Sequence, residues 1–157
     1  MGNSYLLLKT IHIVGAVIFL GNIIVTGWWK AMADKHGNPI VIAFAQRQIT
    51  LTDFIFTGGG VAIMSAGAFG NAYLNGLDLL GINWLYKGLL IFTISGAIWV
   101  LILIPIQYKQ AKLARSFEAG GEIPEQYWRL NRQWFVWGIL DTLIPLAAIY
   151  WMVFKPT

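Results

Sequence analysis

The sequence contains no cysteine, and only 11% of its 157 residues are charged. The lack of cysteine excludes disulfides, thiolate-held iron–sulfur clusters, Cys-rich zinc sites and covalent c-type haem attachment. Any redox chemistry would therefore need a non-covalent cofactor. A soluble domain usually carries about 25% charged residues. The low charge, together with 57% hydrophobic residues, indicates a membrane protein.

Four apolar runs are each long enough to cross a hydrocarbon core of about 30 Å as a helix. They cover residues 5–29, 54–73, 82–107 and 134–154. The connections between them are too short to bury a core of their own. We therefore predict an all-α, four-helix transmembrane bundle with short cytoplasmic connecting helices, forming a single transmembrane domain over residues 1–157. One connecting helix, at residues 39–48, is expected to lie on the inner surface.

The net charge of +4 is unevenly distributed. Most of the 11 lysines and arginines lie in the first and third connections: Lys30, Lys35, Arg47, Lys109, Lys112, Arg115, Arg129 and Arg132. By the positive-inside rule these connections face the cytoplasm and both termini face out. This topology explains the basic balance, so we do not expect nucleic-acid binding.

Small residues recur at every fourth position of the second span, at Gly58, Ala62, Ala66 and Gly70. Such a ridge lets two helix backbones approach closely in a membrane. It predicts a helix–helix seam, either inside the bundle or across a dimer.

Two ionisable side chains from different spans, His12 and Lys87, are expected at a similar depth near the outer side. Charges in hydrocarbon are costly, so such residues are the best functional pointers in the sequence. Gly15 and Ala16 leave the helix face beside His12 open for a partner helix or a planar ligand. The structural alternatives are a His12 hydrogen bond to a neighbouring helix and a Lys87 side chain that reaches the headgroups beside Trp84.

A second polar layer lies nearer the inner side and includes Asn22, Asp53, Gln107, Arg132 and Asp141. Asp141 needs a partner or a proton, and an ion pair with an arginine is preferred to a proton path. Asp53 directly precedes the second span, so we expect it to cap that helix.

Four segments resemble a bacterial family of integral membrane proteins called domain of unknown function 2269. They are residues 8–15 (Leu-Lys-Thr-Ile-His-Ile-Val-Gly), 20–30, 47–54 and 128–134. The resemblance implies a four-helix, multi-pass protein of the bacterial inner (cytoplasmic) membrane.

A shorter resemblance links the chain to the HemJ-type protoporphyrinogen oxidases and the CopD-type membrane proteins. In the HemJ type a His-Ile pair ligates haem b and a later span begins Trp-x-x-Lys; the matching residues are His12-Ile13 and Trp84 with Lys87. The further histidine of that family has no counterpart in the third span.

The resulting hypothesis is a b-type haem-binding membrane protein that serves electron transfer, porphyrin oxidation or gas sensing. His12 would be the axial metal ligand, and Lys87 a propionate partner or second ligand, with Gly15, Ala16 and Trp84 completing the site. His36 lies too far from His12 for a bis-His site in one chain. Three sets of haem ligands therefore remain: His12 alone, His12 together with Lys87 or Met64, or His12 from each subunit of a homodimer. The alternative is a cofactor-free structural or assembly protein, or a small-solute transporter.

Overall fold

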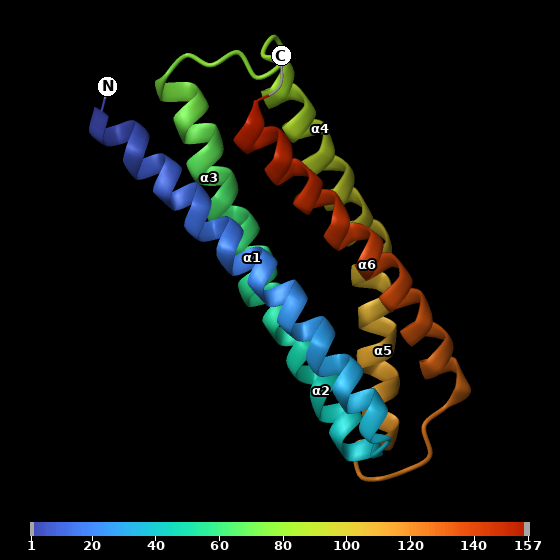
Figure 1. Ribbon diagram of the computed structural model, residues 1–157. Coiled ribbons are helices and arrows are strands. Elements are labelled where there is room, and N and C mark those ends of the chain that lie inside the picture. Colours follow the sequence, from blue (N-terminus) through green and yellow to red (C-terminus); the bar gives the residue numbers. More distant parts are fainter. Residues whose placement is uncertain (1, 156–157) are drawn as a thin grey trace.

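The computed structural model describes residues 2–155, which are helical apart from the connections (Figure 1). The helices are α1 (Gly2–His36), α2 (Pro39–Thr52), η1 (Asp53–Gly58), α3 (Gly59–Leu74), α4 (Asn83–Ile98), η2 (Trp99–Leu103), α5 (Ile104–Phe117) and α6 (Glu125–Phe154), where η denotes a π-helical segment. They join into four rods long and apolar enough to cross a membrane: Gly2–His36, Pro39–Leu74, Asn83–Phe117 and Glu125–Phe154. This confirms the predicted all-α four-helix bundle.

The expected connecting helices continue the spans instead of lying beside them. Residues 39–48 belong to α2, which runs through η1 into α3 without a break. Asp53 lies inside this rod with helical backbone angles, φ −64° and ψ −42°. The prediction that Asp53 caps a helix is therefore wrong, because the helix begins 14 residues earlier. Its cap is Asn38, whose side-chain oxygen accepts hydrogen bonds from the backbone N–H groups of Ile40 and Val41.

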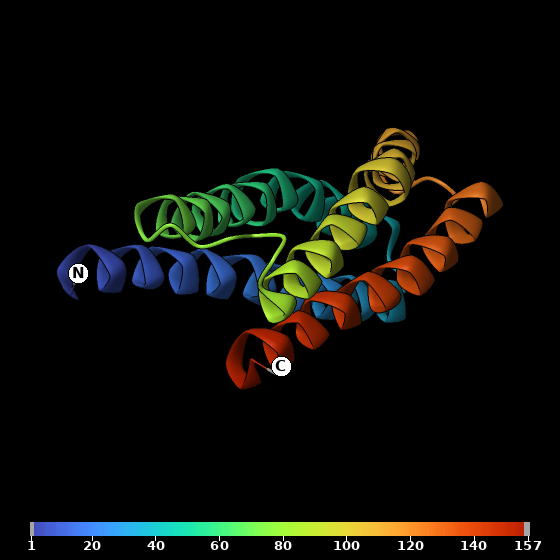
Figure 2. The same cartoon turned by 90° about the horizontal axis from the view of Figure 1, so that it is seen from above.

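The rods form two pairs that diverge towards one end of the molecule. We call α1 with α2–η1–α3 the first pair, and α4–η2–α5 with α6 the second pair. The two pairs pack together at the closed end, which holds the turn at residues 37–38 and the connection at residues 118–124 (Figure 1). They separate towards the open end, which holds residue 2, the loop at residues 75–82 and residue 155. Figure 2 shows the same divergence from above.

Packing differs between the two ends of the bundle. The closed end contains the apolar core, formed by Ala33, Ile42, Ala43, Ala114, Phe117 and Tyr127. At the open end, no described residue of α3 has its Cα within 8 Å of one in α4 or α6. The two pairs therefore pack against each other at the closed end, and at the open end only the loop at residues 75–82 connects them.

Close backbone contact holds the first pair together along α1 and α3. A Cβ atom added to Gly60 would lie 2.7 Å from the backbone nitrogen of Phe19, and one added to Gly15 would overlap the backbone of Met64. The seam therefore runs along Gly60 and Gly67 of α3. Of the predicted ridge, Gly70 faces the Leu8 side chain of α1, whereas Ala62 and Ala66 are exposed and lie outside this seam. A seam across a dimer at these alanines stays a prediction.

Candidate functional site

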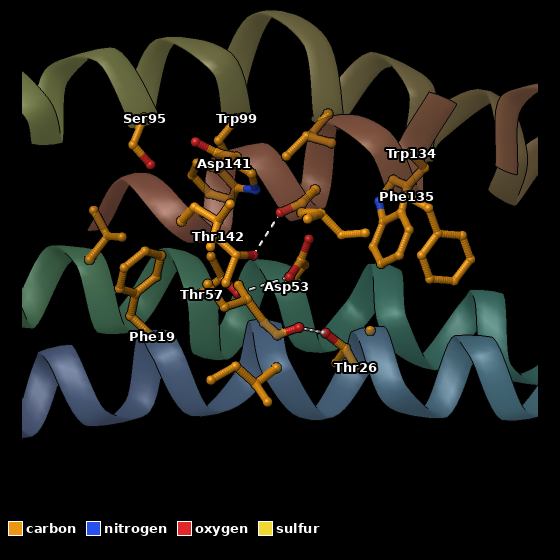
Figure 3. Close-up of a pocket in the computed structure, with 18 of the residues that line it drawn as sticks. Phe19, Thr26, Asp53, Thr57, Ser95, Trp99, Trp134, Phe135, Asp141 and Thr142 are labelled. Carbon is orange, nitrogen blue, oxygen red and sulfur yellow. Dashed lines mark hydrogen bonds between the residues drawn. The ribbon is translucent and has the colours of Figure 1, made fainter. Parts of the chain in front are cut away.

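A cavity of about 450 Å³ lies between the two pairs, just above the closed end. We call it the cleft. Its walls come from α1, η1 and α3 of the first pair and from α4, η2 and α6 of the second (Figure 3). Most of the lining is apolar, including Phe19, Phe92, Trp99, Trp134 and Phe135. Its size and composition are typical of a small-molecule site.

Asp53 is the carboxylate that the first pair contributes to the cleft. The hydroxyl of Thr57 donates to Asp53 Oδ1 at 2.8 Å, and the Asn22 amide nitrogen lies 3.3 Å from the same oxygen. Trp99 and Gln107 face this carboxylate from the second pair. Asp53 and Thr57 both belong to η1, and π-helical turns of this kind occur frequently at functional sites.

Asp141 is the carboxylate that α6 contributes from the opposite wall (Figure 3). It is only 8% exposed, and Ser95 of α4 lies beside it. Its Oδ1 has no hydrogen-bond partner within residues 2–155. The expected ion pair with an arginine is absent there too, because the one ion pair in this part of the chain joins Lys30 and Asp34. Asp141 thus faces the cleft without a countercharge.

A buried lysine lies between the cleft and the closed end, and the sequence analysis counted it only as a topological charge. Lys30 is 1% exposed, and its ammonium donates to Gln46 Oε1 and to the Tyr127 hydroxyl, each at 2.9 Å. Asp34 Oδ1 lies 3.9 Å from it, one helical turn along α1. Two features of the sequence could have indicated this buried pair. Lys30 and Asp34 are four residues apart, a spacing that brings them together on a helix, and Lys30 lies on the same helix face as Phe19 and Thr26.

The residues proposed around His12 lie on the first pair, away from the cleft. His12 Nδ1 is 2.9 Å from the carbonyl oxygen of Met64, which can only accept, so Nδ1 donates this hydrogen bond and Nε2 is the ring nitrogen that points away from it. The α3 backbone fills the space beside Gly15, whereas Ala16 is half-buried on α1.

The other two predicted residues, Trp84 and Lys87, lie on α4 of the second pair. The Lys87 ammonium is 4.9 Å from the centre of the Trp151 ring, and the Lys155 ammonium is 5.0 Å from the centre of the Trp84 ring. No described residues of α1 and α4 have Cα atoms within 8 Å of each other. One chain therefore does not bring His12 and Lys87 together.

The surroundings of His12 agree with a role as haem ligand, whereas those of Lys87 do not. A ligating histidine usually donates its other ring N–H to a carbonyl or carboxylate, and His12 does so to Met64. Lys87 does not fit as a ligand in the same subunit. Residues 2–155 also contain no group of three or more His, Cys, Asp or Glu side chains that could hold a metal ion.

Comparison with known proteins agrees with the membrane architecture. No curated protein and no solved structure matches the chain significantly. A family model described as "Predicted integral membrane protein (DUF2269)" matches residues 6–156, which is nearly the whole chain. The chain therefore belongs to this family of predicted integral membrane proteins, domain of unknown function 2269.

Proposed function

We propose that this protein is a small-solute transporter that binds a lipophilic cation in the cleft. The observation that carries the proposal is the position of Asp53 and Asp141 on opposite walls of one apolar cavity. An uncompensated charge in a membrane-embedded site is costly, so such residues mark ion and substrate pathways. An organic cation would be neutralised by one of these carboxyl groups in its ionised form, while its apolar body would contact the rest of the wall.

Aromatic side chains support a cationic solute. The indoles of Trp28, Trp99 and Trp134 all line the cleft. Indole faces attract cations, with an effect of about 2 kcal/mol or more where water is excluded. An anionic solute would meet two carboxylates and three electron-rich ring faces, and would therefore be rejected.

The arrangement of the rods supports transport as well as binding. The two pairs are packed together only at the closed end (Figure 1). The cleft lies between them and is lined by residues of both pairs. Both π-helical segments border the cleft, with Asp53 and Thr57 in η1 and Trp99 in η2. Rigid-body movement of one helical unit against another around a fixed site is the usual basis of alternating access. We propose that the pairs move in this way about η1 and η2.

Two probes of the same shape and opposite charge test the charge preference. Protein in lipid nanodiscs is titrated with tetraphenylphosphonium or with tetraphenylborate, and the quenching of tryptophan fluorescence is corrected with empty nanodiscs. We expect saturable binding of the cation alone, weakened about tenfold in D53N and in D141N. The matched control is D78N, in the exposed loop at residues 75–82. Equal binding of both probes, or full affinity in both cleft variants, would contradict the proposal.

Haem b binding is a second candidate function, favoured by the His12 hydrogen bond. The Met64 carbonyl orients the imidazole and leaves Nε2 as a ligand, with His12 of a second subunit as the other axial ligand in a homodimer. Bound haem would supply electron transfer, porphyrin oxidation or gas sensing. Protein purified from haem-supplied cells is expected to show Soret absorption that H12A loses and H36A keeps. No Soret absorption in the wild type, or its retention in H12A, would exclude this candidate.

A further inference from the structure

Five buried polar atoms of the second polar layer and the closed end have no hydrogen-bond partner within residues 2–155. They are Asp34 Oδ1, Trp99 Nε1, Gln107 Nε2, Gln110 Oε1 and Asp141 Oδ1. Trp99 and Asp141 line the cleft. Gln107 and Gln110 follow on one face of α5, one turn apart, and are 4% and 0% exposed.

Hydrogen bonds continue this line to the closed end. The Gln110 amide donates to Asn131 Oδ1 at 3.3 Å, and the Asn131 amide donates to Asp34 Oδ2 at 2.9 Å. Asp34 in turn lies beside the Lys30 ammonium. Polar side chains therefore lead from the cleft to the Lys30–Asp34 pair, through a part of the bundle where both helix pairs meet.

Bound water is the usual partner for buried polar atoms that the protein itself leaves unpaired. Leaving such atoms dry costs free energy, and native proteins place ordered waters, each with two to four hydrogen bonds, at such sites. Both donors among the unpaired atoms, Trp99 Nε1 and Gln107 Nε2, face the Asp53 carboxylate without making a direct hydrogen bond to it, so water can bridge them to that carboxylate. The unpaired acceptors can be reached by further waters. Amide side chains would hold these waters, and Asp53, Asp141 and Asp34 are the groups along the line that can accept and release protons.

We infer that a column of bound water joins the cleft to the Lys30–Asp34 pair and conducts protons between the cleft carboxyls and the closed end. This inference rests on the proposed cation binding and adds its coupling. A cation that enters the cleft replaces a proton on Asp53 or Asp141, and that proton leaves through the water column by way of Asp34. One positive charge is bound and one is released, so the site stays neutral.

The surroundings of these carboxyls agree with proton transfer in place of passage of a larger ion. Asp53 faces the uncharged Asn22, Thr57, Trp99 and Gln107, from α1, η1, η2 and α5. Asp141 has Ser95 of α4 beside it. At the far end the Lys30 ammonium lies 3.9 Å from Asp34 Oδ1, and its positive charge would repel a metal cation at that carboxyl.

Hydration of the column is tested by solid-state NMR of the protein in lipid bilayers. Magnetisation is transferred from water to the side-chain amides of Gln107 and Gln110. In the wild type we expect strong transfer of magnetisation from water to both side-chain amides, and exchange of their protons for deuterium in D₂O. In Q110L we expect the transfer from water to the Gln107 amide to be lost. The matched control is Q126L, at an exposed position of α6. Amides that receive no magnetisation from water in the wild type would overturn the inference.

Proton conduction is tested in liposomes with an enclosed pH indicator and a potassium diffusion potential set by valinomycin. We expect proton entry above that of empty liposomes, reduced about tenfold in D34N and in Q110L and unchanged in Q126L. If the protein causes no proton entry, the proposed proton conduction is wrong, even if the NMR measurement detects water beside Gln107 and Gln110. Tetraphenylphosphonium titration of the same Q110L protein separates the two proposals. Retained binding with lost conduction supports the path, whereas loss of both shows that Q110L damages the cleft and overturns a separate column.

Discussion

The closed end and the cleft both contain buried ionisable side chains, but these side chains differ in how many partners surround them. At the closed end Lys30 has two hydrogen bonds, a nearby carboxylate and the faces of Tyr127 and Trp134 around its ammonium. In the cleft Asp141 has an oxygen without any partner among the residues described. A buried charge that is fully surrounded fixes the arrangement of helices, whereas one left open is suited to a ligand or a proton. We therefore assign the Lys30 ammonium at the closed end to structure and the cleft carboxyls to function.

The largest effect is expected at the closed end. K30M removes the ammonium that both Gln46 and Tyr127 accept from, and leaves the Asp34 carboxylate without its nearby positive charge. Removing one member of a buried charged cluster typically lowers the free energy of unfolding by about 3–5 kcal/mol. Thermal unfolding in detergent measures the change, and K35M, at an exposed position of the same helix, is the control. Equal stability of the two variants would remove the distinction between the two regions.

The seam between α1 and α3 is expected to give the next largest effect. G60A forces a methyl group against the Phe19 backbone, and overpacking of this kind costs about 1–3 kcal/mol. The neighbouring Gly59 has no atom within 4 Å of an added Cβ. G59A should therefore be neutral or stabilising, because alanine favours helix over glycine. The same loss of stability in both variants would place the seam elsewhere.

A smaller effect, of opposite sign, is expected in the cleft. D141L removes a carboxyl oxygen that has no partner and should raise the free energy of unfolding by about 1 kcal/mol. The same change should weaken saturable tetraphenylphosphonium binding by about tenfold, as D141N does. Unfolding and titration are measured on one preparation. A variant that is destabilised like K30M would show that Asp141 is structural.

The smallest effect is expected in the loop at the open end. Backbone N–H groups of Gly81 and Leu80 donate to Asp78, and these bonds hold the pKa of its carboxyl below the ordinary value. The stabilisation is therefore complete above the ordinary pKa and is lost as the pH falls through the lower, folded-state pKa. NMR signals of the Leu80 and Gly81 amides should follow this titration in the wild type and be insensitive in D78N. A midpoint at or above the ordinary value would contradict the assignment.

The sequence predicted the number of rods and the polar layer, because long apolar runs and isolated charges depend on local composition. It did not predict that residues 39–52 extend the second rod, because they contain too few apolar residues to span a membrane by themselves. Their direction depends on the packing of α2 against α5. Within the chain, Ala62 and Ala66 of the predicted ridge on α3 lie outside the seam with α1. Small residues occur on several faces of that helix, and the facing Gly15 decides which face is used. The position of Asp53 opposite Asp141 in one cavity depends on how the two helix pairs pack, and no sequence pattern indicated the π-helical segment that contains Asp53.

Proton release on cation binding tests the central claim most directly. Tetraphenylphosphonium is added to the protein in weakly buffered nanodiscs, and a pH indicator reports protons while fluorescence reports binding. We predict about one proton released for each cation bound, and no release from the double variant with D53N and D141N. Saturable binding without proton release in the wild type would contradict the account.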